Sequence, residues 1–287
     1  MTQSKAETAR PPQQQNKQPG SEKPMRPRPQ DRAENYRAAG KLEGKVALIT
    51  GGDSGIGRST AIAMAKEGAD IAFAYLDEHD DAAETERLIS ATGRSCKRLS
   101  GDLASRDTAV RIVEETLSTF GKIDILINNA AEQHVAKSLT EIDEAQLKTT
   151  FGTNIFAMFF LTQTVLPHLK KGAAIINTTS ITAFHGHPVL IDYASTKGAI
   201  VAFTRSMAKA LVDQGIRVNA VAPGPVWTPL IPASFSAEEV AKFGNSNPMG
   251  RAAEADEISP CYVFLASEDA AFMTGQVLHP NGGEYMA

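Results

Sequence analysis

The sequence predicts a single α/β domain, a doubly wound fold in which a sheet of seven parallel strands is flanked by helices. Short apolar runs rich in β-branched residues alternate with amphipathic stretches of helical length, and a glycine cluster directly follows the first of these runs. Strands separated by single helices pair in parallel through right-handed crossovers. Such a sheet has its ligand crevice at the carboxyl ends of its strands.

Each element has its own signal in the chain. Seven runs are expected to form strands: 46–50, 71–75, 95–99, 124–127, 173–178, 217–221 and 276–279. Helices are expected at 55–67, 80–92, 107–119, 144–169 and 192–213. The helix ends are marked by glycine or proline, at Gly68, Gly93, Gly121, Pro167 and Gly172. We find no sign of a second domain or of an internal repeat.

The composition narrows the class of protein. The chain has 287 residues, of which 42% are hydrophobic and 22% are charged, and this balance is typical of a soluble globular protein. A net charge of −4 argues against a nucleic-acid partner. Cys96 and Cys261 lie far apart and no cluster has metal-ligand spacing, so we expect neither a disulfide framework nor a metal site. No apolar stretch of membrane length and no secretory signal is apparent, which favours the cytoplasm.

The N-terminal segment differs from the rest of the chain. Residues 1–45 hold six of the fifteen prolines, six glutamines, and ten Lys or Arg against five Asp or Glu. Few large apolar residues precede Leu42, so this segment buries too little surface to offset its ordering entropy. We expect residues 1–44 to form an arm that is flexible over about residues 1–30, with the part near Tyr36 lying across the folded body or a neighbouring subunit. A solubilising or docking extension fits this composition better than a dedicated binding segment.

A glycine loop stands between the first strand and the first helix. The loop reads Thr50-Gly-Gly-Asp-Ser-Gly-Ile-Gly57, and its glycines let the backbone approach a pyrophosphate at a helix N-terminus. Its spacing differs from that of the general dinucleotide fingerprint. In this position a nucleotide site is favoured over a glycine-rich turn without a ligand. The residues expected to contact the nucleotide here are Gly51, Asp53, Ser54, Gly55, Ile56 and Gly57.

Two later turns lie where the same ligand would pass. Asp102 and Leu103 follow the third strand, where a carboxylate can accept from an adenine amino group while its neighbour packs on the ring. Asn129, Ala130 and Ala131 follow the fourth strand, where small residues permit close approach to a ribose. Either segment alone is only a turn, and the prediction rests on their shared position at the strand ends.

Tyr193 and Lys197 are a candidate acid/base pair. Residues four apart on a helix project from one face. A phenol has an unperturbed pKa near 10, and a fixed ammonium close by lowers it towards neutrality. In isolation such a pair is more often a solvated helix face, so the other motifs decide its meaning.

With these motifs in place, the chain resembles the short-chain dehydrogenase/reductase family from about Lys45 to Gly283. The resemblance is carried by motifs in the family's order: Gly51, Gly55 and Gly57, then Asn128-Asn129-Ala130, Asn154, Ser180 thirteen residues before Tyr193, Lys197, and Pro223-Gly224. The proline-rich arm and the glycine loop look most like a bacterial general-stress and aldehyde-reductase type subgroup, to which glucose/ribitol dehydrogenase-like proteins are similar. The resemblance implies that residues 45–287 form an NAD(P)-binding Rossmann-like catalytic domain.

The resemblance also implies catalytic roles. Tyr193 would exchange a proton with the substrate oxygen, and Lys197 would lower the tyrosine pKa and hold the nicotinamide ribose. Ser180 would bond the substrate oxygen, and Asn154 would hold a water that links Lys197 to solvent. Contacts with the nicotinamide end are expected from Pro223, Gly224, Val226 and Thr228. Contacts with the substrate are expected from Ser180, Tyr193, His187 and Trp227, with His185, His134, Phe235 or Phe243 as further candidates under a lid at 227–250.

The cofactor is expected to be NAD or NADP, with no preference established. Tyr75 and Leu76 end the second strand, where neither the family's usual NAD marker nor its NADP marker is present. Asp53 and Asp77 would repel a 2′-phosphate, whereas Arg58 or Arg87 would attract one. The substrate class implied is a small aldehyde, ketone, sugar or polyol.

Assembly and two rival functions remain to be considered. The helices at 144–169 and 192–213 carry apolar or small residues on more than one face, and family members commonly pair such helices in tetramers, so we expect a homotetramer. The alternative function is a non-catalytic nucleotide-binding sensor or scaffold on the same fold. A third reading is an epimerase or dehydratase with a tightly held cofactor. The four catalytic-type residues favour the oxidoreductase over a scaffold.

Overall fold

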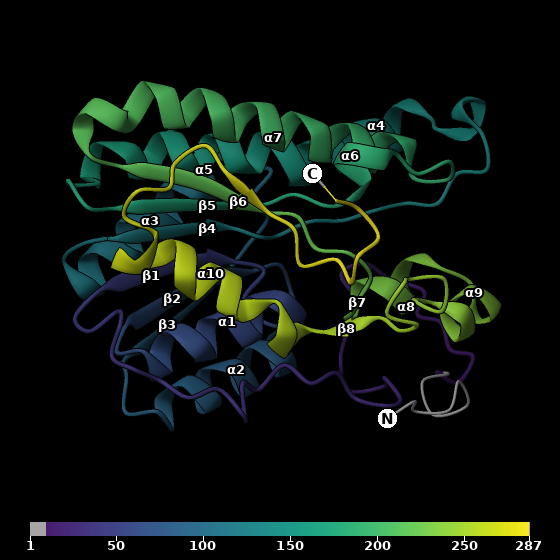
Figure 1. The fold of residues 1–287 in the computed structure, drawn as a ribbon, viewed down its shortest axis with the longest axis horizontal. Coiled ribbons are helices and arrows are strands. Elements are labelled where there is room, and N and C mark those ends of the chain that lie inside the picture. The colour runs from purple at the N-terminus through teal and green to yellow at the C-terminus, as the bar shows by residue number, and fades with distance from the viewer. Residues whose placement is uncertain (1–9, 287) are drawn as a thin grey trace.

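The structure, a computed structural model, describes residues 10–286, and it has the expected doubly wound architecture. A parallel sheet has the strand order β3-β2-β1-β4-β5-β6-β9 (Figure 1). Its strands are β1 (Val46–Thr50), β2 (Asp70–Tyr75), β3 (Cys96–Ser100), β4 (Ile125–Asn128), β5 (Ala174–Thr178), β6 (Arg217–Val221) and β9 (Val277–Leu278). The order reverses between β1 and β4, so a crevice opens there at the carboxyl ends.

Helices cover both faces of the sheet, as Figure 1 shows. One face carries α1 (Gly55–Lys66), α2 (His79–Ser90) and α10 (Ser259–Ala266). The other carries α3 (Arg106–Phe120), α5 (Ala157–Val165) and α7 (Ile191–Leu211). Helix α10 was not expected, because its sequence is apolar on almost every side and therefore lacks the period that marks an amphipathic helix.

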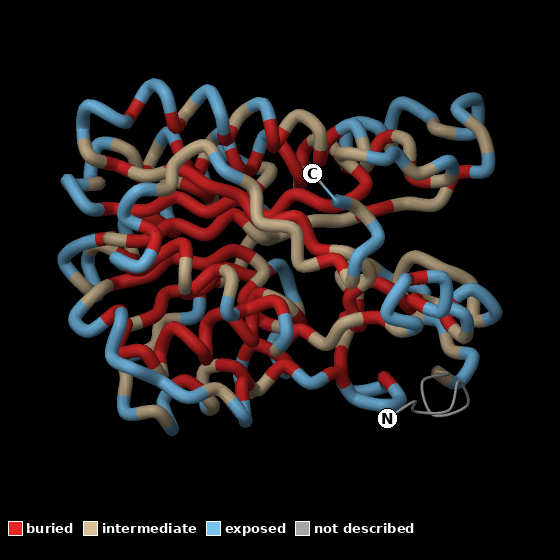
Figure 2. The backbone as a smooth tube through the Cα atoms, in the orientation of Figure 1, coloured by how far each residue is buried: buried red, intermediate tan, exposed pale blue. Residues whose placement is uncertain are grey.

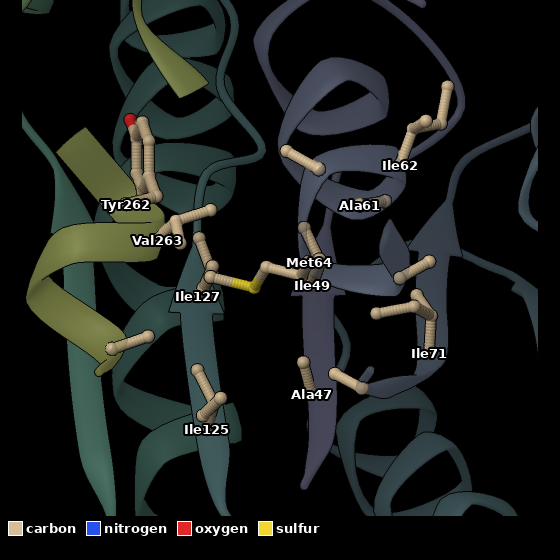
Figure 3. Close-up of a cluster of buried hydrophobic side chains, with 14 of the residues drawn as sticks. Ala47, Ile49, Ala61, Ile62, Met64, Ile71, Ile125, Ile127, Tyr262 and Val263 are labelled. Carbon is tan, nitrogen blue, oxygen red and sulfur yellow. The ribbon is translucent and has the colours of Figure 1, made fainter. Parts of the chain in front are cut away.

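The core is built on strands that are buried on both faces. In Figure 3, isoleucines of β1, β2 and β4 pack against α1 and α10. The labelled side chains are Ala47, Ile49, Ala61, Ile62, Met64, Ile71, Ile125, Ile127, Tyr262 and Val263. Strands of this kind read as continuous apolar runs, which is why the sequence locates them well.

The single helix expected at 144–169 is interrupted in the structure. It consists of α4 (Glu144–Phe151), a π-helical turn (Gly152–Phe156), α5 and a 3₁₀ turn (Leu166–His168). The π turn adds a residue to the helical repeat and directs Asn154 inwards, where it is buried. Such turns occur mostly at functional sites.

A small lid stands beyond the strand ends. It consists of a parallel pair, β7 (Val226–Trp227) and β8 (Ala253–Glu254), with α8 (Leu230–Ser234) and α9 (Ala237–Lys242) between them (Figure 1). The remaining elements are α6 (Thr182–His185) and 3₁₀ turns at Leu139–Glu141, Val212–Gln214, Ala255–Glu257 and Glu268–Ala270. No helix among residues 10–286 is both long and apolar enough to cross a membrane.

The described part of the N-terminal arm lies against the folded body. Its residues 10–44 run from the lid along the α1 face to β1, with buried stretches that Figure 2 shows. Met25, Ala33 and Leu42 are at most 2% exposed. The Tyr36 hydroxyl donates to Glu67 over 2.6 Å, as expected for the part across the body. Single apolar anchors and loop contacts hold this segment, and composition does not reveal such anchors. The expectation for residues 1–9 lies outside the described residues.

Candidate active site

A cavity of about 530 Å³ opens at the carboxyl ends of the strands. Its volume is within the range of small-molecule and cofactor sites. Every residue expected to contact the cofactor lines it, with one exception. These residues are Gly51, Asp53, Ser54, Gly55, Ile56, Tyr75, Leu76, Asp102, Leu103, Asn129, Ala130, Ala131, Tyr193, Lys197, Pro223, Gly224, Val226 and Thr228. The exception is Gly57, which lies behind the loop.

The glycine loop is shaped for close approach. A Cβ at Gly57 would stand 1.8 Å from the Gly51 carbonyl oxygen, so only glycine lets α1 pack against the loop. Gly51 has φ +63°, and a Cβ there would stand 3.1 Å from the Ala130 Cα. Ser54 precedes α1 without a side-chain capping bond. Ser54, Gly55 and Ile56 line the cavity, so the positive end of α1 faces it and fits the anionic pyrophosphate of a dinucleotide.

The asparagine turn after β4 braces the glycine loop. The Asn129 side-chain amide donates to the carbonyl oxygens of Thr50 and Gly51 over 3.1 and 3.3 Å. Its oxygen accepts from the Thr178 hydroxyl over 3.2 Å. One side chain thus ties the ends of β1 and β5 together below the cavity.

Ser180, Tyr193 and Lys197 come together on one wall of this cavity. Ser180 follows β5, and the other two lie on consecutive turns of α7. The Lys197 Nζ lies 5.2 Å from the centre of the Tyr193 ring and donates to the Thr178 carbonyl over 3.0 Å. All three side chains are buried. The pair expected from the sequence is therefore placed beside the glycine loop, in a site with room for a ligand.

Known proteins are similar to this chain in sequence and in fold. A family model described as enoyl-(acyl carrier protein) reductase matches residues 51–284. The chain is 57% identical over 276 residues to the uncharacterized oxidoreductase YhdF of Bacillus subtilis, and the match covers 96% of each chain. It is 52% identical to a glucose and ribitol dehydrogenase of Daucus carota, over 95% of this chain and 96% of that protein. A crystal structure of a short-chain dehydrogenase from Burkholderia cenocepacia in complex with NADP matches with a TM-score of 0.79 and 29% identity, over 85% of this chain and 98% of that one.

The chain belongs to the short-chain dehydrogenase/reductase family. It is therefore an oxidoreductase that uses NAD or NADP, and the predicted likeness to glucose/ribitol dehydrogenase-like proteins is confirmed. The glycine cradle and the buried lysine fit a dinucleotide, so the residues of this dehydrogenase/reductase match the cofactor of its family.

Burial dominates the electrostatics of the acid/base pair in this reductase. It raises the pKa of Tyr193 to about 12, and the neighbouring Ser180 hydroxyl opposes this shift. It lowers the pKa of Lys197 to about 7. The expected lowering of the tyrosine pKa by Lys197 is therefore not found in the protein alone, because desolvation disfavours the charged form of both groups. At neutral pH Tyr193 keeps its proton and is a potential donor.

Asn154 does not line the main cavity. Its side-chain oxygen accepts from the Glu132 amide over 2.9 Å, and its amide donates to the Glu132 carbonyl over 3.0 Å and to Thr196 over 3.1 Å. It borders a separate cavity of about 10 Å³ together with Thr178 and Asn128. That volume suits about one water molecule. Asn154 thus fixes the loop after β4.

The substrate end of the cavity contains several of the expected side chains. His185, His187, Phe235 and Phe243 line it, and the two phenylalanine rings lie 6.3 Å apart between their centres. The His187 Nδ1 is buried, and among the described residues it has no hydrogen-bond partner. Burial lowers the pKa of His187, so it is neutral near pH 7. His187 therefore lines the cavity as a neutral, partly buried side chain.

Trp227 and His134 are not at the cavity, contrary to expectation. Trp227 is fully buried and its indole donates to the Pro27 carbonyl over 3.0 Å. The guanidinium of Arg10 lies 4.5 Å above its ring. Trp227 therefore anchors the N-terminal arm to the lid. His134 instead lies beside Glu132 and Gln18.

Neither arginine suggested for a 2′-phosphate lines the cavity. Arg58 is 1% exposed, and its guanidinium pairs with carboxylates of Glu22, Asp31 and Asp81. Arg87 pairs with its neighbour Glu84 on the surface of α2. Asp77, expected to repel the phosphate, pairs with Lys17 of the arm.

Sequence reasoning missed two groups of lining residues. Pro19 and Gly20 of the arm line the cavity, as do charged residues of the lid and its surroundings, Glu132, Glu239, Lys242 and Glu284. A Pro-Gly pair in a glutamine-rich segment is typical of a linker, and an isolated charged residue on a lid helix is typical of a solvent-exposed face. Only the folded chain brings them to the site. Residues 10–286 contain no group of three or more metal-ligating side chains.

Proposed function

We propose that the chain reduces the carbonyl group of a hydroxylated aldehyde or ketone, such as an open-chain sugar, with Tyr193 as proton donor. The observation that carries this proposal is the convergence of Ser180, Tyr193 and Lys197 on the cavity that the glycine loop also lines. When bound, the reduced dinucleotide supplies the hydride. The hydride and the proton together convert the carbonyl into an alcohol.

Tyr193 donates its Oη proton to the substrate oxygen as negative charge develops there. A phenol with a pKa of about 12 is protonated at neutral pH and is more acidic than an alcohol. The Ser180 hydroxyl, which neighbours Tyr193 at the cavity wall, stabilises the same oxygen by a hydrogen bond. Protonation and charge stabilisation thus come from one wall.

Lys197 positions the ribose beside this wall. Among the described residues its only hydrogen-bond acceptor is the Thr178 carbonyl, so further donors on its Nζ are available to ribose hydroxyls. Asn154 holds the loop after β4 in register with α7, and the small cavity beside it and Thr178 has room for about one water molecule. Lys197 therefore positions the cofactor, and Asn154 positions the loop beside it.

The substrate class follows from the polar lining. His185, His187, Glu239, Lys242 and Ser246 line the substrate end and offer both donors and acceptors. A site lined in this way is suited to a chain of hydroxyl groups. The printed name of the Daucus carota relative, glucose and ribitol dehydrogenase, supports the same class.

A carbonyl panel with NADH and NADPH tests the proposal. We expect oxidation of the dinucleotide with hydroxylated aldehydes or ketones, and oxidation about 10³-fold slower with Tyr193→Phe. Faster turnover of aliphatic aldehydes than of hydroxylated ones would contradict the substrate class. Equal inertness of the wild type and the variant across the panel would favour the sensor or scaffold instead.

We also propose a homotetramer in the cytoplasm. Phe156 and Phe159 are 49% and 41% exposed, and Phe159 packs against Phe203 at 4.7 Å between ring centres. An exposed aromatic pair on the faces of α5 and α7 is suited to a subunit interface. Sedimentation is expected to give a tetramer mass that falls when Phe156 and Phe159 are both replaced by glutamate. A monomer mass at all concentrations would contradict the tetramer.

The proposed location in the cytoplasm fits the cysteines, which are both free thiols, as in a reducing compartment. Cell fractionation tests this location.

A further inference from the structure

Six arm residues, 17–22, run beside the cavity, which Pro19 and Gly20 line, and we call this segment the strap. Lys17 lies at one end, where its Nζ pairs with Asp77 after β2 over 2.5 Å. Its side chain is 64% exposed, whereas Gly20 is buried. The strap therefore has one face towards solvent and one towards the interior.

The middle of the strap is tied to the loop after β4. The Gln18 side-chain amide donates to the Gln133 carbonyl over 2.5 Å, and its oxygen accepts from the Gln133 amide over 3.2 Å. One side chain thus pairs with both polar groups of one backbone residue. This arrangement fixes the strap against a loop that lines the cavity.

The next residues form part of the cavity wall. Pro19 and Gly20 both line the cavity. A Cβ at Gly20 would stand 2.4 Å from the Pro229 carbonyl oxygen, so the strap meets the lid backbone as closely as glycine allows. This contact joins the arm to the loop that follows β7.

The far end of the strap is fixed at α1. The Glu22 carboxyl accepts from the Gly55 amide over 3.1 Å and pairs with Arg58. Burial and the neighbouring Asp31 raise the pKa of Glu22 to about 9, and the Arg58 guanidinium opposes this shift. The strap is thus attached to four loops around the crevice.

We propose that the strap is part of the dinucleotide site and retains the bound cofactor by covering it from the solvent side. The loops that it joins are those expected to contact the adenosine, the pyrophosphate and the nicotinamide. The proposal rests on the proposed function, in that the dinucleotide must lie in this cavity. Its consequence is kinetic, because the ligand leaves only after contacts of residues 17–22 have broken.

Matched substitutions in the full chain test the strap. Gln18→Ala removes the pair with Gln133, and Gly20→Val forces the strap away from the lid. Gln13→Ala is the control, because Gln13 makes the same two-bond amide pair with Arg26 inside the arm and does not line the cavity. The rate of NADH or NADPH release is measured by stopped-flow fluorescence after displacement with excess oxidised dinucleotide.

We expect Gln18→Ala and Gly20→Val to release the cofactor about tenfold faster than wild type, the effect of losing one or two hydrogen bonds. Gln13→Ala is expected to change the rate less than about twofold. Equal rates in all four proteins, with tight binding intact, would overturn the strap and leave the proposed function standing. Failure of wild type to bind either dinucleotide would overturn the function itself.

Hydrogen exchange of the wild type gives a second measurement that needs no variant. Addition of NADH or NADPH is expected to slow amide exchange in residues 17–22 and to leave residues 10–16 unchanged. Unchanged exchange in 17–22 with the cofactor bound would reject the proposal. If a strap variant proves too unstable to assay, this measurement still decides the matter.

Discussion

The catalytic wall and the strap border the same cavity but are held in place differently. Ser180, Tyr193 and Lys197 lie within 18 residues of one another, and the fold of β5 and α7 fixes their spacing. The strap comes from the N-terminal part of the chain and is held by a few polar contacts with loops. We therefore expect proton transfer by Tyr193 and the cofactor retention proposed for the strap to respond to different substitutions, because a change at Tyr193 leaves the contacts of the strap intact.

The largest expected effect is that of Tyr193→Phe, a substitution that changes the catalytic wall and leaves the strap intact. Tyr193→Phe removes one hydroxyl from a buried site and leaves the ring packing unchanged. General acid catalysis contributes roughly 10² to 10⁴ in rate, so we expect kcat to fall by about 10³. Cofactor release is expected to stay within about twofold of wild type. Steady-state kinetics measure kcat, and the stopped-flow assay measures cofactor release. A decrease in kcat of less than about tenfold would mean that a group other than Tyr193 donates the proton.

The second-largest expected effect is a loss of stability when Arg58, which holds the arm against α1, is replaced. Arg58 is buried among Glu22, Asp31 and Asp81, so Arg58→Met leaves buried carboxyl groups without their cation. We expect the free energy of unfolding to fall by about 3 to 5 kcal/mol. Urea unfolding measures this difference.

The control for that substitution is Arg87→Met. The Arg87 side chain is 60% exposed and, among residues 10–286, pairs only with a neighbour on its own helix, so its loss is expected to cost less than about 0.5 kcal/mol. Similar losses for the two variants would mean that Arg58 does not hold the arm.

The parts of the fold and of the site that local sequence patterns encode could be predicted, and the parts that depend on distant contacts could not. The strands and the glycine loop were predictable because apolar runs and local spacing encode them, and the same holds for the motif Tyr193 to Lys197. Helix α10 was missed because it is apolar on nearly all sides, and the inward turn at Asn154 depends on a π turn that no local pattern marks. Trp227 was misplaced because its partner, Pro27, lies 200 residues away in a segment whose composition resembles a linker.

The smallest effect concerns the cost of burying Lys197. Burial lowers the pKa of Lys197 from its ordinary value of 10.5 to about 7. Between these two pH values the unfolded chain binds the proton and the folded chain does not, so this lysine makes the protein more stable as the pH rises from 7 to 10.5. Lys197→Met has no such proton, so the variant is expected to exceed wild type in stability most near pH 7.

That advantage is expected to shrink by roughly 1 to 3 kcal/mol between pH 7 and pH 9.5, as urea unfolding at each pH shows. Other titrating groups contribute equally to both proteins and cancel in the difference. Lys209→Met, on an exposed turn of α7, controls for the loss of a lysine from this helix. A difference that is flat with pH would mean that Lys197 keeps its charge in the folded protein, and that Tyr193 then has a charged partner after all.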